Sequence, residues 1–159
     1  MKAIVGNNIY VDDAFRPGAI LVEEGRIVEF VEKLPENYAG QIDQVADLYV
    51  MPGIVDTHVH INEPGRTDWE GFETATKAAA AGGITTVVDM PLNCLPVTTT
   101  VENFQTKLRE VDGKLWVDTG FWGGVVPDSI DSLDELLGSG VLGVKSFTID
   151  SGIPEFPEM

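Results

Sequence analysis

The chain has 159 residues, with 10 Lys and Arg against 26 Asp and Glu, which gives a formal net charge of −16 at pH 7. Nucleic acids and anionic membrane surfaces are bound through clustered basic residues, and no stretch of this sequence concentrates them, so we expect neither as a partner. Hydrophobic residues make up 43% of the chain and charged residues 23%, a composition typical of a folded domain and too apolar for a disordered chain.

A cytoplasmic location is the expectation from the remaining composition. The single cysteine, Cys94, excludes an intrachain disulfide, and the N-terminus does not combine basic residues with an apolar segment as a signal peptide does. No run approaches the roughly 18–20 consecutive apolar residues that a membrane-spanning helix requires. We therefore expect a protein that does not enter the membrane.

The first fifty residues read as short β-strands joined by turns. Hydrophobic residues gather in segments 1–11, 19–22 and 26–31, with Gly6-Asn7-Asn8 inside the first segment. The sequence Glu23-Glu24-Gly25 separates the last two segments and indicates a hairpin. Because so few strands cannot bury a sheet face alone, we expect partner strands from elsewhere.

From Met51 onward the pattern changes to alternating strands and helices. The sequence predicts strands at 53–60, 84–90, 115–126 and 141–147, and helices at 72–81, from Thr99 to about 111, and at 128–137. Capping-box patterns at 67–70 and 99–102 precede the first two helices, and Gly82-Gly83 ends the first. Such alternation is typical of a parallel sheet with right-handed crossovers, either doubly wound or a (β/α)8 barrel.

Chain length bears on the choice between these folds. No Gly-x-Gly-x-x-Gly opens the first helix, which disfavours the dinucleotide-binding form of the doubly wound sheet. A barrel needs about 200–250 residues, and only about a hundred follow Met51. Four unclosed parallel strands would expose apolar faces, so we expect the chain to be the N-terminal part of a longer protein.

The two histidines, His58 and His60, lie two residues apart near the end of the strand predicted at 53–60. Residues with this spacing point to the same side of a strand, so both imidazoles could bind one metal ion at the rim where barrel enzymes carry their chemistry. Two strand histidines without a ligand would give the same spacing. Asp56, on the same side, could be a ligand, a residue that orients one, or a surface acid.

Residues 51–60, MPGIVDTHVH, resemble the signature of the amidohydrolase superfamily, in the branch of cyclic amidohydrolases that comprises dihydroorotases, hydantoinases and allantoinases. The similarity continues through residues 63–74, 82–86, 90–93, 143–147 and 151–157, and the pattern is most like that of allantoinases. The resemblance implies a partial β-sandwich for residues 1–51. It implies the first half of a metal-dependent (β/α)8 TIM-type barrel for residues 52–159.

The resemblance also implies two divalent metal ions, usually Zn²⁺, with His58 and His60 on the more buried ion and Lys145 as the bridging ligand. A free ammonium has no acceptor, but a lysine amine that captures CO2 becomes a carbamate with one oxygen for each metal. The alternative is a lysine whose stem packs while its head reaches solvent. The family's catalytic Asp and two further histidines would lie beyond Met159, so we expect no catalytic residue here and no activity from this chain alone.

Two asparagines are the candidate substrate-binding residues. Dihydroorotase-like enzymes carry Arg two positions after the second histidine, where it grips a substrate carboxylate. Asn62 occupies this position and suits a neutral ureido-hydantoin such as allantoin. Asn93 resembles the family's substrate-contacting Asn, or is a turn residue.

The resemblance thus implies hydrolysis of allantoin to allantoate in purine breakdown, by a full-length protein that forms a homotetramer. The alternatives are a hydantoinase or dihydropyrimidinase and a non-catalytic, truncated assembly partner.

Overall fold

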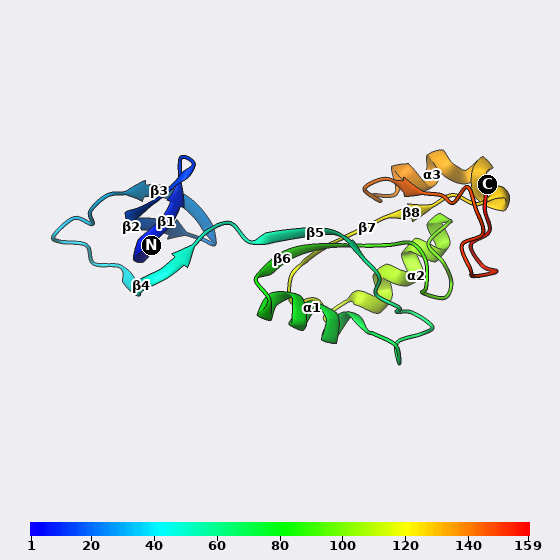
Figure 1. The fold of residues 1–159 in the computed structure, drawn as a ribbon, viewed down its shortest axis with the longest axis horizontal. Coiled ribbons are helices and arrows are strands. Elements are labelled where there is room, and N and C mark those ends of the chain that lie inside the picture. The colour runs from blue at the N-terminus through cyan, green and yellow to red at the C-terminus, as the bar shows by residue number, and fades with distance from the viewer. The chain divides into compact units, whose positions relative to one another are not determined.

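The computed structural model describes residues 1–159 and divides them into two compact units, Met1–Pro52 and Gly53–Met159 (Figure 1). The first unit contains strands only, whereas the second alternates strands and helices. None of the helices combines the length and the apolar character that crossing a membrane would take.

The first unit is a single four-stranded sheet in the order β3-β2-β1-β4. Its strands are β1 (Lys2–Val11), β2 (Ala14–Glu23), β3 (Arg26–Val31) and β4 (Gln41–Val50). The predicted β2–β3 hairpin is present, and Glu24 and Gly25 have the positive φ angles, 50° and 77°, of a type I′ turn. A second sheet is not formed by these residues, so the β-sandwich stays a prediction.

Two features of the first unit differ from the sequence-based expectations. Strand β1 is not regular, because its register with β2 shifts between Gly6 and Ile9, at the segment Gly6-Asn7-Asn8. The fourth strand, β4, was not predicted, because four of its ten residues are polar and its apolar positions do not alternate regularly. It pairs with β1 in parallel, and this pairing between segments distant in the sequence cannot be predicted from a local pattern.

The second unit follows the predicted alternation. Its elements are β5 (Ile54–Val59), α1 (Phe72–Ala81), β6 (Ile84–Asp89), α2 (Val101–Val111), β7 (Asp118–Phe121), β8 (Gly123–Gly124), the 3₁₀ helix η1 (Pro127–Ser132), α3 (Leu133–Gly138) and β9 (Val144–Lys145). Strands β5, β6 and β7 form a parallel sheet in chain order, and β8 pairs with β9 in parallel. Neighbouring parallel strands joined by helices are the arrangement expected of part of a (β/α) barrel.

The predicted boundaries fail toward the end of the unit. The long strand expected at 115–126 is two short strands separated at Trp122, and the strand expected at 141–147 is reduced to Val144–Lys145. The helix expected at 128–137 begins as the 3₁₀ helix η1. Glycine-rich strands have few side chains to pack, which is why their ladders are short.

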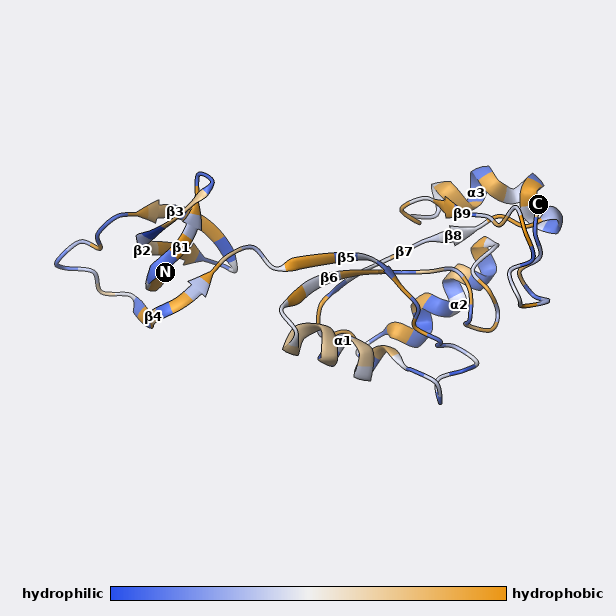
Figure 2. Cartoon of the chain, in the orientation of Figure 1, coloured by the Kyte–Doolittle hydropathy of each residue, from blue (hydrophilic) through white to orange (hydrophobic).

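The hydrophobic core of the second unit lies between its sheet and its helices. Seven buried side chains form it: Ile61, Phe72, Phe104, Val111, Phe121, Leu136 and Val141. The Phe121 ring makes edge contacts with Phe72 and Phe104, at centroid distances of 6.0 and 5.7 Å. Helix α2 turns its apolar residues toward this core, and Figure 2 shows both hydrophobic and hydrophilic residues along it.

Candidate metal site

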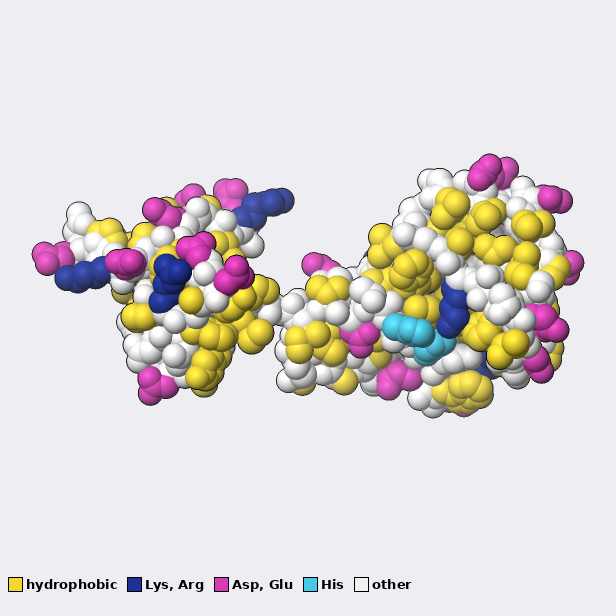
Figure 3. Space-filling view, turned by 45° about the horizontal axis from the view of Figure 1, so that its top comes forward, with side chains coloured by type: hydrophobic (Ala, Val, Ile, Leu, Met, Phe, Trp, Pro, Cys, Tyr) yellow, Lys and Arg dark blue, Asp and Glu magenta, His cyan; other side chains and the backbone are white.

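The two histidines lie side by side at the carboxyl end of β5. His58 is on the strand and His60 is the first residue after it; their ring centroids are 5.4 Å apart, with an interplanar angle of 41°. Both residues are exposed, and Figure 3 shows the two rings together on the surface of the second unit, beside a basic side chain. Partial burial, the charge of Lys145 and that of His58, in this order, lower the pKa of His60 below 6.5, which favours the neutral, metal-binding ring.

Lys145 lies near His60 in the structure, although the two lie 85 positions apart in the sequence. It lies on β9, whose pairing with β8 puts it next to Gly124. Its ammonium is 4.8 Å from the centroid of the Phe147 ring, and the residue is half-buried. The Lys145 side chain forms no ion pair with any carboxylate of the chain, although the chain is strongly acidic.

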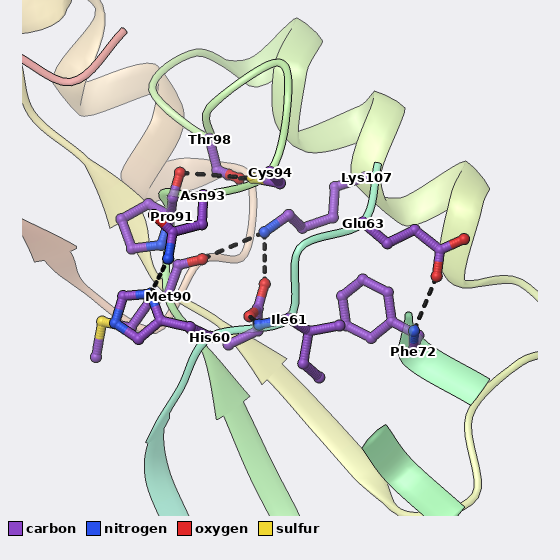
Figure 4. Close-up of polar contacts among 11 residues, drawn as sticks. His60, Ile61, Glu63, Phe72, Met90, Pro91, Asn93, Cys94, Thr98 and Lys107 are labelled. Atoms are coloured by element: carbon purple, nitrogen blue, oxygen red, sulfur yellow. Dashed lines mark hydrogen bonds and ion pairs between the residues drawn. The ribbon is translucent and has the colours of Figure 1, made fainter. Parts of the chain in front are cut away.

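Asn93 lies in the loop after β6, with its side chain directed at His60 (Figure 4). The distance from Asn93 Nδ2 to His60 Nδ1 is 3.4 Å. Its backbone is in the left-handed region, with φ of 76°, which asparagine tolerates better than most residues. The Arg66 guanidinium donates a hydrogen bond to the Asn93 carbonyl at 3.0 Å and stacks on Trp69, so it is engaged by the protein.

Asn62 is placed differently from Asn93. The residue is 9% exposed, and its Oδ1 atom is buried without a hydrogen-bond partner. Its backbone holds the loop between β5 and α1, because its N–H donates to Glu70 and its carbonyl accepts from Arg66. A buried acceptor without a donor is uncommon and is consistent with a ligand group that completes it.

Sequence reasoning missed the buried ion pair behind this site. Asp89, at the end of β6, and Lys107, on α2, are both fully buried, with 2.5 Å between Lys107 Nζ and Asp89 Oδ2. The other carboxylate oxygen accepts a hydrogen bond from the Ile61 N–H at 2.7 Å. Burial raises the pKa of Asp89 to about 6, against the opposing effects of Lys107 and of hydrogen bonds from Ile61 and Met90. Lys107 occupies a core position of α2, three residues after Phe104, and this spacing was the available signal.

Sequence reasoning also missed Glu63, which anchors the loop after β5. Helix α1 begins at Phe72 as predicted, but the capping box expected at 67–70 does not cap it, because the residue at the N-cap is Gly71, which has no side-chain cap. Instead Glu63 Oε2 accepts a hydrogen bond from the Phe72 N–H at 2.8 Å, and Glu63 Oε1 receives Lys114 Nζ at 2.5 Å. The 4% exposure of Glu63 makes this a buried cap.

Replacing Glu63 by Ala is expected to lower the free energy of unfolding by about 2 kcal/mol. The buried Phe72 N–H loses the carboxylate oxygen that caps the helix, and Lys114 loses its buried partner. Glu63→Gln keeps an oxygen for this N–H and should cost about 1 kcal/mol, the loss of the ionic part alone. Urea unfolding of both variants measures the difference. Equal destabilisation would show that the cap contributes nothing.

The chemistry of these residues decides whether they fit a divalent metal ion. Two imidazoles that can each offer a lone pair suit zinc, and no cluster of three or more His, Cys, Asp and Glu side chains occurs in the chain. A further ligand from this chain must therefore be of another type, and Lys145 is the nearby candidate because it has no competing carboxylate. Asp56 accepts the N–H of His58 at 3.0 Å, which engages one of its oxygens in the strand. The set thus fits part of a metal site.

Comparisons with known proteins give the chain its family. A model of the Amidohydrolase family matches residues 49–142. An allantoinase of Saccharomyces cerevisiae is 45% identical over 167 residues, which cover 99% of this chain and 36% of that protein. A mitochondrial allantoinase of Aquarana catesbeiana is 53% identical over 141 residues, which cover 88% of this chain and 29% of that protein.

A solved structure agrees with these relatives. The L-hydantoinase (dihydropyrimidinase) from Arthrobacter aurescens superposes with a TM-score of 0.88 at 28% identity, over 99% of this chain and 35% of that chain. The chain therefore spans about a third of the length of the proteins it matches. From the family match and these identities, the chain belongs to the amidohydrolase family.

Proposed function

We propose that this chain forms the first metal-binding part of a cyclic amidohydrolase that opens the hydantoin ring of allantoin to give allantoate. The observation that carries the proposal is the pair of adjacent rings of His58 and His60, with the charge of Lys145 close enough to lower the pKa of His60. The 45% identity to an allantoinase over 99% of the chain supports the choice of substrate.

In this proposal His58 and His60 hold one divalent ion, most simply Zn²⁺, and Lys145 links it to a second. The Lys145 ammonium first gives up one proton to solvent; the neutral amine then forms a bond to CO2 and releases a second proton, which gives a carbamate with two oxygens. The lack of a carboxylate partner leaves this nitrogen available. When bound, the two metal ions supply Lewis acidity for the amide carbonyl and lower the pKa of water to about 7.

Asn62 and Asn93 are the residues proposed to orient the substrate. Both offer an uncharged amide, which can donate to a ring carbonyl or accept from a ring or ureido N–H. The unpartnered oxygen of Asn62 calls for a donor, and allantoin is rich in N–H groups. Arg66 supports a neutral substrate indirectly, since its guanidinium is already bound to Asn93, Trp69 and Glu155 and is not free for a carboxylate.

The proposal is tested by assaying both the 159-residue chain and the polypeptide of the complete reading frame, with Zn²⁺ and bicarbonate present. The substrates are allantoin, hydantoin and dihydroorotate, compared by kcat/KM. We expect the complete polypeptide to prefer allantoin and the chain alone to be inactive. Faster turnover of dihydroorotate would contradict the argument from Asn62.

In the complete polypeptide, Asn93→Gly is expected to raise the KM for allantoin by about 10-fold, the effect of losing one hydrogen bond to the substrate. Glycine adopts the positive φ of position 93 without strain, so the change removes the side chain and leaves the backbone intact. Steady-state kinetics and urea unfolding of the same variant separate binding from stability. An unchanged KM would assign Asn93 to the loop alone.

The same assays distinguish two alternative functions from the proposed one. The superposition on an L-hydantoinase favours a hydantoinase or dihydropyrimidinase as the second candidate, which preferential turnover of hydantoin would support. A non-catalytic assembly partner would bind no metal and would self-associate. A cytoplasmic location and a homotetramer of the complete protein stay predictions, and the relative from Aquarana catesbeiana is described as mitochondrial.

A further inference from the structure

We propose that the buried pair of Asp89 and Lys107 is a positioning device for His60 and holds its backbone for metal binding. The proposal rests on the proposed function, in which His60 is a metal ligand. It assigns a role to the only fully buried ion pair of the chain, whose two side chains are 0% and 1% exposed.

His60 needs such a device because it lies beyond the regular ladder. β5 ends at Val59, so no strand pairing restrains the residue that follows. Its two flanking peptide groups are instead held by consecutive residues at the end of β6. The Met90 N–H donates to the Val59 carbonyl at 2.8 Å, and the Ile61 N–H donates to Asp89 Oδ1 at 2.7 Å.

Because peptide groups are planar, these two hydrogen bonds restrain the backbone conformation of His60. The Val59 carbonyl belongs to the peptide group before His60, and the Ile61 N–H belongs to the group after it. Because each group is planar, fixing both directions restrains φ and ψ of His60 and therefore the origin of its side chain. The Asp89 carboxylate acts through the backbone, because it accepts from the Ile61 N–H, whereas the Ile61 side chain is part of the hydrophobic core.

Lys107 orients the Asp89 carboxylate that binds the Ile61 N–H. Its Nζ atom lies 2.5 Å from Asp89 Oδ2 and 3.3 Å from the Met90 carbonyl, so it bridges the same two residues that hold His60 (Figure 4). Packing alone does not require this arrangement, since apolar side chains of similar volume generally replace a buried ion pair at little cost to stability. Asp89 and Lys107 are accordingly positioning residues.

The test begins with Asp89→Asn. In Asp89 the Ile61 N–H and Lys107 are bound by different carboxylate oxygens, and asparagine replaces one of these oxygens by an NH2 group, so one of the two donors loses its acceptor. Its Zn²⁺ affinity, measured by competition with a chromophoric chelator on the 159-residue chain, is expected to fall by about 10- to 100-fold, the usual effect of losing a residue that supports a ligand. In the double variant Asp89→Asn with Lys107→Met, the amide oxygen is free for Ile61, and most of the affinity is expected to return.

Val111→Ala is the matched control, because it weakens the same core on the same helix without touching Asp89. Even if Val111→Ala lowers the free energy of unfolding as much as Asp89→Asn does, it should leave the Zn²⁺ affinity nearly unchanged. Hydrogen exchange of the Ile61 amide gives a readout that needs no metal: it should accelerate at least tenfold in Asp89→Asn relative to Val111→Ala.

The outcomes separate this proposal from the proposed function. Zn²⁺ binding that does not depend on His58 and His60 would overturn the proposed function, and the exchange of the Ile61 amide would still decide whether Asp89 holds this backbone. If Asp89→Asn binds Zn²⁺ as tightly as Val111→Ala, or exchanges Ile61 at the same rate, the positioning role is wrong. Failure of the double variant to regain affinity would equally contradict it.

Discussion

Replacing Lys145 by Ala in the polypeptide of the complete reading frame is expected to lower kcat/KM for allantoin by at least about 10³-fold. In the proposed site this lysine, as a carbamate, would be a ligand of two metal ions, and each ion would contribute several kcal/mol of charge stabilisation, where about 1.4 kcal/mol is a factor of ten. The bound zinc, measured by atomic absorption, should fall in parallel. Lys33→Ala is the control, because Lys33 is an exposed lysine of the first unit that forms no ion pair.

A small carboxylate tests whether the missing group is a carbamate. Acetate carries the same pair of oxygens on one carbon, so it is expected to restore part of the activity of Lys145→Ala. It should have no such effect on His58→Ala, where a nitrogen ligand is missing. Equal activity of Lys145→Ala and the wild type would show that Lys145 only packs against Phe147.

The parts of this structure that the sequence predicted are those with a local signal. The alternating strands and helices from 53 onward follow from apolar periodicity, and α1 has the bounds that were expected. The proximity of His58 and His60 could be predicted, because residues two apart on a strand point to the same side. Lys145, by contrast, entered only through the family resemblance, since no pattern in the sequence relates position 145 to position 60.

What the sequence did not reveal depends on contacts between distant segments. Glu63 caps a helix that starts nine residues later, whereas capping patterns are read within four. The Asp89–Lys107 pair joins the end of one strand to the middle of the next helix, and an acid after an apolar strand reads equally well as a surface residue. Only the fold brings the lysine at a core position of α2 to that acid.

The Asp89–Lys107 pair also gives the largest expected effect on stability. Lys107→Met is expected to lower the free energy of unfolding at pH 7 by about 3–5 kcal/mol, because it leaves a buried carboxylate without its partner. Lys77→Met makes the same change in an exposed pair, Lys77 with Glu73, and should cost less than about 1 kcal/mol. Urea unfolding at pH 7 measures both. Equal losses in the two variants would mean that burial of the pair has no energetic consequence.

The pH dependence of the same group has a definite sign. Burial raises the pKa of Asp89 from 3.8 to about 6 in the folded state, so folding favours the protonated form. The stability that this group contributes is therefore complete below about pH 4 and is lost in the wild type as the pH rises through about 6. Without Lys107 the pKa of Asp89 should rise further, since the pairing that favours its charged form is gone. The deficit of Lys107→Met relative to the wild type should consequently shrink between pH 7 and pH 5, where Asp89 is protonated in both proteins, and a deficit that grows on acidification would contradict this account of the pair.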